Sequence, residues 1–284
     1  MSNPFPSAIA LSSNSADASA ANAAQPDWRE NLQAAASKVP EVTLGFWVIK
    51  IAATTLGETG GDALSMSLKL GYALSTVILF LPFLVLVTAQ IRVRKFHRFL
   101  YWAVIVGTTL AGTTMADFAD RSLGIGYAGG TSILFALVLL SLLVWKLTVG
   151  TVSASTIVTP RAELFYWITI LFSNTLGTAL GDWTDEATGF LGGVKLFFIL
   201  LAILGALYLF TKVSRTFLFW SAFILTRPLG ASLGDLLTKP HDDGGLNLSR
   251  FSSSAVLLAF MILCILLFPQ RSSGHPGAKT HKTA

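Results

Sequence analysis

The chain has 284 residues, of which 53% are hydrophobic and only 12% are charged, and its mean hydropathy is +0.65. A soluble globular domain carries about twice this share of charged residues, so the composition excludes an ordinary soluble protein and predicts a membrane protein. The formal net charge of +5 is modest and does not indicate nucleic acid as a partner.

In chain order, the predicted elements are a tail, eight apolar runs and a second tail. Residues 1–40 are rich in Ala, Ser, Asn and Pro and lack the basic start and apolar core of a signal peptide, which predicts disorder. Eight apolar runs follow, each near the ~20 residues that a helix needs to cross a bilayer. They lie at about residues 42–60, 71–91, 99–117, 131–147, 164–182, 190–210, 216–234 and 252–268. Residues 269–284 are polar again and are also predicted to be disordered. The expected fold class is an all-α integral membrane protein with eight transmembrane helices.

The odd-numbered runs share a register of four residues. In each copy a Trp is followed by a Gly ten residues later, a Gly or Ala fourteen later and an Asp fifteen later. The copies are Trp47, Gly57, Gly61 and Asp62; Trp102, Gly112, Ala116 and Asp117; Trp167, Gly177, Gly181 and Asp182; and Trp220, Gly230, Gly234 and Asp235. Because each such run is followed by a plainer one, the sequence predicts four parallel two-helix repeats, at 41–92, 96–150, 161–212 and 214–268.

The distribution of charge predicts the orientation of the repeats. The predicted spans divide the basic residues outside them into thirteen on one face of the membrane and five on the other. Since loops rich in Lys and Arg stay on the cytoplasmic side, both termini are expected to be cytoplasmic. Ten of the 15 acids fall on the opposite side or in the outer half of the membrane. Fifteen residues of helix raise each repeat Asp about 22 Å above its Trp, into the outer third of the bilayer.

The acids of the repeats are the candidate metal ligands. The core set is Asp62, Asp117, Asp182 and Asp235; Glu58 adds a carboxylate one turn earlier, and Asp120 and Asp185 follow their repeat Asp by three residues. Hard oxygen ligands of this kind suit Mg²⁺, Mn²⁺ or Ca²⁺, and the absence of Cys and His from the motifs argues against zinc and copper. The alternative interpretation is that each Asp caps the helical turn that follows it.

The motif glycines also have two interpretations. Small residues four apart let a neighbouring helix approach closely, which makes them packing positions. They also weaken the helix just before the acid, so that backbone carbonyls turn towards a ligand.

Two basic residues interrupt the apolar runs. Lys50 lies three residues after Trp47, and we expect its long side chain to reach the cytoplasmic surface. Arg227 lies deeper, beside Pro228, where a kink is expected, and it needs a charge partner for which a repeat acid is the natural choice. Such an arginine is a tethered counter-charge that competes with a bound cation.

The segments around the acids, among them LGETGGDALSMSLKLGYALST and LGTALGDWTDEATGFLGG, resemble a bacterial family of membrane proteins with four copies of a repeat of unknown function. The resemblance covers about residues 38–268. It implies an integral membrane protein and implies no activity; we expect the protein in the inner membrane of a bacterium. Glu58-Thr-Gly-Gly-Asp62 also resembles, more weakly, the Glu-x-Gly-Asp-Lys/Arg-Ser/Thr motif of certain divalent-cation exchangers, with one extra Gly and without the basic residue. We use that second likeness only as a chemical analogy.

These observations predict an inner-membrane transporter of a hard divalent cation such as Mn²⁺. The repeat carboxylates would form a central site, and proton binding by the same acids would drive exchange. The alternative is a non-transporting scaffold or sensor partner with the acids as helix caps. An enzyme is not expected, since there is no His-rich cluster, no Ser–His pair inside a span and no nucleotide loop, and the single Cys264 excludes an intramolecular disulfide. The expected partners are the lipid bilayer and a metal cation or proton, with no resident cofactor and a homo-oligomer left open.

Overall fold

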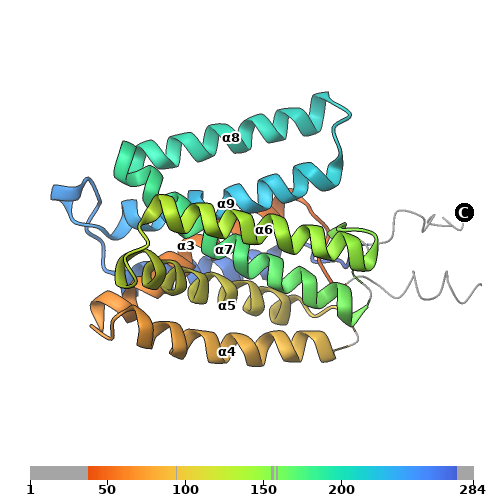
Figure 1. Ribbon diagram of the computed structural model, residues 1–284, viewed down its shortest axis with the longest axis horizontal. Helices are drawn as coiled ribbons and strands as arrows, with labels where there is room; N and C mark the ends of the chain where they lie inside the picture. The colour runs from red at the N-terminus through yellow and green to blue at the C-terminus, as the bar shows by residue number, and fades with distance from the viewer. Residues whose placement is uncertain (1–37, 94, 155–156, 158, 274–284) are drawn as a thin grey trace, which may run out of the picture.

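The computed structural model describes residues 38–273 except 94, 155–156 and 158, and this part of the chain is helical (Figure 1). The predicted tails lie outside it, apart from residues 38–40 and 269–273. The long helices are α3 (Leu44–Asp62), α4 (Tyr72–Arg92), α5 (Arg98–Asp117), α6 (Tyr127–Val149), α7 (Pro160–Thr188), α8 (Phe190–Phe210), α9 (Arg215–Thr238) and α10 (Arg250–Leu267). Two π-helical turns, η1 (Ala63–Ser67) and η2 (Phe118–Ser122), continue α3 and α5, and a short 3-10 turn, η4 (His241–Asp243), precedes α10. The all-α prediction is confirmed.

Each predicted apolar run falls on one helix, and the main difference is the length of α7. That helix continues past the predicted end at residue 182 to Thr188, and only Gly189 separates it from α8. In the first two repeats, by contrast, the helix widens into a π turn after the Asp and a loop follows. Gly71, Gly126 and Gly189 each precede a returning helix with a positive φ of 72–75°, which a residue with a side chain adopts only under strain.

In the described part of the chain, seven of the eight long helices are long and apolar enough to cross a membrane, which indicates a multi-pass membrane protein. The exception is α3, whose apolar run is interrupted by Lys50 and Glu58.

The helices form two layers around one axis. The share of buried residues in the most apolar stretch of each helix separates the two layers. It is 61–67% in α5, α7 and α9 but only 11–17% in α4, α6, α8 and α10. Most residues of α3 are buried as well. The inner helices touch in a closed cycle, α3 to α5 to α7 to α9 and back to α3. Each outer helix packs on the inner helix of the next repeat, with α4 on α5, α6 on α7, α8 on α9 and α10 on α3. Four repeats therefore close into a ring that no single repeat can complete.

The helices run side by side along the long axis of the molecule (Figure 1). At one end lie η1, η2 and the loop with η4, which projects at the left of the figure; we call this the acidic end. At the other, terminal end, Pro40 and Ser272 form an antiparallel bridge that joins the two ends of the described chain. The outward faces of the outer helices expose large apolar side chains such as Val85, Leu139, Phe198 and Val256.

Candidate functional site

Each inner helix presents an axial stripe, which is a row of residues four apart that begins immediately before the repeat Trp. Equivalent residues of the four helices form five layers from the terminal end to the acidic end. The layers are Phe46, Tyr101, Tyr166 and Phe219; Lys50, Ile105, Ile170 and Phe223; Thr54, Thr109, Asn174 and Arg227; Glu58, Thr113, Thr178 and Ala231; and Asp62, Asp117, Asp182 and Asp235. All of these residues except Phe219 are buried. The interior of the ring is therefore mostly aromatic or aliphatic in the first two layers, apart from Lys50, and mostly polar or charged in the other three.

The motif glycines bring the inner helices into close contact. A Cβ atom added at Gly57 would collide with Thr109, one at Gly177 with Arg227, and one at Gly230 with Thr54. Each of these neighbours is the third-layer residue of the next repeat around the ring. At the same contacts, the hydroxyl of Thr109 donates to the carbonyl of Ala53 at 3.2 Å, and that of Thr54 donates to the carbonyl of Thr226 at 3.2 Å. The packing interpretation is confirmed. The idea that the glycines open the helix is wrong, because α3, α5, α7 and α9 stay helical through them.

Arg227 belongs to the third layer, and its guanidinium reaches the residues of the fourth layer. Its Nη2 atom is 2.6 Å from the hydroxyls of both Thr113 and Thr178, and 2.9 Å from Oε2 of Glu58. One nitrogen atom thus meets a residue from each of the other three inner helices. The side chain is wholly buried, and Glu58 is its salt-bridge partner. The prediction that a repeat acid pairs with Arg227 is confirmed, and the partner is Glu58 rather than one of the four repeat Asp residues.

Two further basic residues join the acids of the fifth layer in pairs. Nζ of Lys239 lies 2.9 Å from Oδ2 of Asp62 and 3.1 Å from Oδ1 of Asp235. Arg121 makes the equivalent link between α5 and α7, with Nη2 2.9 Å from Oδ2 of Asp182 and Nε 3.3 Å from Oδ1 of Asp117.

The predicted spans place both basic residues among the five charges of the outer face, in loops outside the helices. The signal that was overlooked is their spacing, since each follows its own repeat Asp by four residues. Burial disfavours the charged form of Lys239, but the carboxylates of Asp235 and Asp62 raise its pKa well above the ordinary value. The Lys239 side chain is therefore protonated and positively charged at neutral pH.

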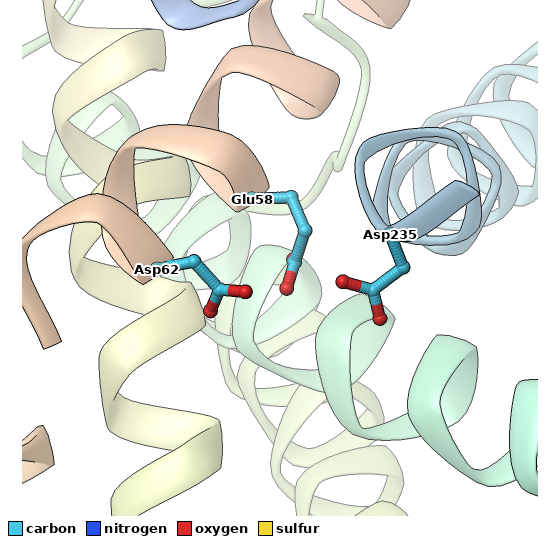
Figure 2. A group of neighbouring side chains, drawn as sticks. All are labelled: Glu58, Asp62 and Asp235. Carbon is cyan, nitrogen blue, oxygen red and sulfur yellow. The ribbon is translucent and has the colours of Figure 1, made fainter. Parts of the chain in front are cut away.

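Three of the seven predicted metal ligands form one group. Glu58, Asp62 and Asp235 are all buried, and each offers a carboxylate oxygen within 4.8 Å of the others. Figure 2 shows the two side chains of α3 and the one of α9 pointing towards one another. Oδ1 of Asp62 is buried and has no hydrogen-bond partner in the part of the chain that the structure describes. A buried carboxylate oxygen without a donor calls for a proton or a cation.

The other four predicted ligands do not join this group. Asp117 and Asp182 come from α5 and α7 and share Arg121. Asp120 and Asp185 point to the outer helices of their own repeats, where Gly130 of α6 and Gly193 of α8 leave room for the carboxylates. Ser232 donates a hydrogen bond of 2.8 Å to Asp185.

The structure does not support the capping interpretation of the repeat acids. Asp62 and Asp117 precede the π turns without a side-chain capping bond. α7 and α9 continue past Asp182 and Asp235, so these residues lie inside their helices. The physical reason is that the chain does not start a new helix at these positions, and no free backbone N–H groups are left for a cap.

The prediction that the Lys50 side chain reaches the cytoplasmic surface is wrong. Its side chain is 0% exposed and belongs to the second layer, which faces the axis rather than the lipid. Nζ lies 3.8 Å from the centroid of the Phe223 ring and has no hydrogen-bond partner among the described residues. A long side chain reaches the surface only when its helix face points outwards, and the stripe of α3 points inwards.

Comparison with known proteins identifies the repeat. Four stretches of the chain, residues 45–96, 100–151, 165–214 and 218–272, match the family model described as Repeat of Unknown Function (DUF347). Each match covers one inner helix and the outer helix that follows it. No curated protein and no solved structure matches the chain. The matched stretches cover most of the sequence, and the chain therefore belongs to the family defined by this repeat.

Proposed function

We propose that this protein is a multi-pass transporter of the bacterial inner membrane that moves a cation along the axis of its inner helices. The substrate is a hard divalent ion such as Mn²⁺, and protons are the coupled ion. The observation that carries the proposal is the buried group of Glu58, Asp62 and Asp235, whose oxygens lie within 4.8 Å of one another. Several carboxylate oxygens at such separations match the ligand preference of hard divalent cations. Acids inside membrane spans are costly and mark ion pathways.

The basic side chains explain how such a site would be kept closed between transport events. Five carboxylates of the fourth and fifth layers, those of Glu58, Asp62, Asp117, Asp182 and Asp235, make ion pairs with Arg121, Arg227, Lys239 and Arg250. Five carboxylates and four basic side chains give this cluster a formal net charge of −1, which one bound proton would neutralise. A divalent ion brings two positive charges, so its binding requires that a basic side chain leave the cluster.

Lys239 is the basic residue best suited to leave. It follows the last residue of α9, and 14% of its side chain is exposed, whereas Arg227 is wholly buried inside its helix. Its ammonium bridges Asp62 and Asp235, two of the three acids that would bind the ion. We infer that the substrate cation replaces this ammonium when Lys239 swings towards the acidic end.

Flux measured in proteoliposomes tests the proposal. Wild-type protein should let Mn²⁺ enter vesicles that contain a metal-sensitive dye. Asp62→Asn and Asp235→Asn keep the shape of the side chain but remove its charge, and each should reduce the flux to the level of empty vesicles. Asp243→Asn is the matched control, because Asp243 is exposed in the η4 turn and lies outside the stripe. Wild-type flux in both stripe variants, or no flux with the wild type, would contradict the mechanism.

A second candidate, a non-transporting membrane scaffold or sensor partner, is favoured by one observation. Every acid of the fourth and fifth layers already has a basic partner within ion-pair distance, as expected for a purely structural network. Lys239→Gln separates the two candidates. The transporter proposal expects tighter Mn²⁺ binding, because the competing ammonium is gone, whereas the scaffold reading expects only lower stability. Exposed Lys195→Gln serves as the control.

A further inference from the structure

Lys50, in the second layer, is the one charged residue of the axial stripe that lies outside the ion pairs of the fourth and fifth layers. Lys50 stands where the other repeats have Ile105, Ile170 and Phe223, and all four residues are 0% exposed. Its Nζ atom lies over the Phe223 ring, 3.8 Å from the centroid, and lacks a hydrogen-bond partner within the described part of the chain. An amine with no donor or acceptor partner is expensive to bury as a charged group, so its position on the axis calls for an explanation.

The groups around Lys50 come from each helix that lines the ring. One layer towards the terminal end, Tyr101 of α5 and Tyr166 of α7 share a hydrogen bond of 2.7 Å between their hydroxyls. One layer towards the acidic end is Arg227 of α9, whose positive charge acts on Lys50. On α3 itself, Glu58 is two layers away and is bound to Arg227. α10, which also packs on α3, has no titratable side chain between Arg250 and Cys264. The amine thus has two phenols on one side, an arginine on the other and no acid in its own layer.

We propose that Lys50 is a proton-binding site of the transport cycle, an inference that rests on the proposed function and names the residue that holds the coupled proton. Arg227 links Lys50 to the acids, because its guanidinium contacts Glu58. While Glu58 is free of metal, it neutralises Arg227, and Lys50 can carry a proton. When a cation binds Glu58, the charge of Arg227 is no longer compensated, and it repels the ammonium one layer away.

The proton then leaves Nζ, whose lone pair remains on the nitrogen, and passes towards the hydroxyl pair of Tyr101 and Tyr166 at the terminal end. Each hydroxyl that relays the proton forms one O–H bond and gives up another, so the net change is the loss of one N–H bond at Lys50 and the gain of one O–H bond in water at the terminal end. When the cation leaves, the reverse step restores the ammonium. Proton binding at Lys50 and cation binding at Glu58 exclude each other, and mutual exclusion of two ions is the requirement for exchange.

The first test separates coupling from flux. Lys50→Met removes the amine and keeps the length of the side chain, and Ile105→Met makes a similar change in the same layer of the next repeat. Proteoliposomes with equal Mn²⁺ on both sides and a pH gradient should accumulate the ion when they contain wild type or Ile105→Met. With Lys50→Met they should lose this accumulation and keep downhill Mn²⁺ flux. Accumulation by Lys50→Met at the wild-type level would overturn the inference and leave the proposed function intact.

The second test does not depend on flux. Nuclear magnetic resonance of protein labelled with ¹⁵N-lysine identifies the Lys50 side chain as the signal that disappears from the spectrum of Lys50→Met. The chemical shift of this signal reports whether the amine is charged. We expect the signal to change from ammonium to amine within the pH range where the protein stays folded. An ammonium that persists over the whole range would overturn the inference, even if the wild type transports. A titrating signal in a wild type without flux would support Lys50 as a proton site and refute the proposed function.

Discussion

At the scale of single residues, the charged groups of the second, third and fourth layers are departures from the four-fold pattern. Arg227 stands where the other repeats have Thr54, Thr109 and Asn174, and Glu58 stands where they have Thr113, Thr178 and Ala231. The two exceptions come from helices adjacent in the ring and pair with each other at 2.9 Å. A wholly buried charge is tolerated only when an opposite charge and further hydrogen bonds compensate it. Repeats one and four therefore depend on each other electrostatically.

This pairing makes a prediction about stability. Arg227→Met leaves the buried Glu58 carboxylate without its counter-charge, and breaking a buried ion pair in this way costs about 3–5 kcal/mol. The double variant Glu58→Gln with Arg227→Met removes both charges and should recover most of that loss. Unfolding in detergent micelles measures the difference, with exposed Arg215→Met as the control. A single variant as stable as the wild type would show that the pair contributes nothing to the fold.

The sequence predicted the partner of Arg227 but not the direction of Lys50 or the roles of Arg121 and Lys239. In a membrane helix both the lipid-facing side and the side facing other helices are apolar, so hydropathy does not reveal which face a lone Lys occupies. Arg121 and Lys239 were missed because the spans were expected to end at the repeat Asp. The helical turns continue beyond it and bring a residue four positions later back over the carboxylate.

At the scale of the helices, close backbone contacts at the motif glycines hold the ring, and large aromatic side chains such as Phe46, Trp102 and Trp220 pack between the helices towards the terminal end. The eight runs were predictable because an apolar stretch of about 20 residues is a direct signal. Their arrangement was not, since each outer helix packs on the inner helix of the next repeat and not mainly on that of its own. Glycine is required where a third-layer side chain of the neighbouring repeat lies against the helix backbone. Hydroxyl-to-carbonyl bonds at these contacts, such as that of Thr54 to Thr226, fix the register of adjacent helices.

One glycine substitution tests this account of the helix contacts. A Cβ atom at Gly230 would lie 2.8 Å from the backbone carbonyl carbon of Thr54, so Gly230→Ala must push α9 away from α3. We expect a loss of about 1–3 kcal/mol in the free energy of unfolding, the usual cost of overpacking. Gly205→Ala is the control, because Gly205 of α8 has open space around its Cβ position. Alanine there should be neutral or stabilise by up to about 1 kcal/mol. Equal stability of the two variants would contradict the close-contact model.

At the scale of the whole molecule, the ring separates the charges. The acids of the fifth layer and the loops with η1, η2 and η4 occupy one end, and the bridged segments around Pro40 and Ser272 occupy the other. Because eight long helices lie between Pro40 and Ser272, the described chain begins and finishes at the same end of the bundle. In the sequence, the basic residues of the tails and loops predicted on the side of the termini outnumber those on the other side by thirteen to five, which favours the cytoplasm for the terminal end.

This orientation predicts which positions a membrane-impermeant thiol reagent reaches from outside. The chain has one cysteine, Cys264, so a Cys264→Ser background makes every introduced cysteine unique. Glu186→Cys and Asp243→Cys, both exposed at the acidic end, should react in intact cells. Arg161→Cys and Arg215→Cys, exposed at the terminal end, should react only after the membrane is permeabilised. The expectation rests on the proposed insertion, in which the bundle crosses the bilayer along its axis and its two ends lie in different compartments. The reverse labelling pattern would place the acidic end in the cytoplasm, and labelling of all four positions from outside would mean that the bundle does not span the membrane.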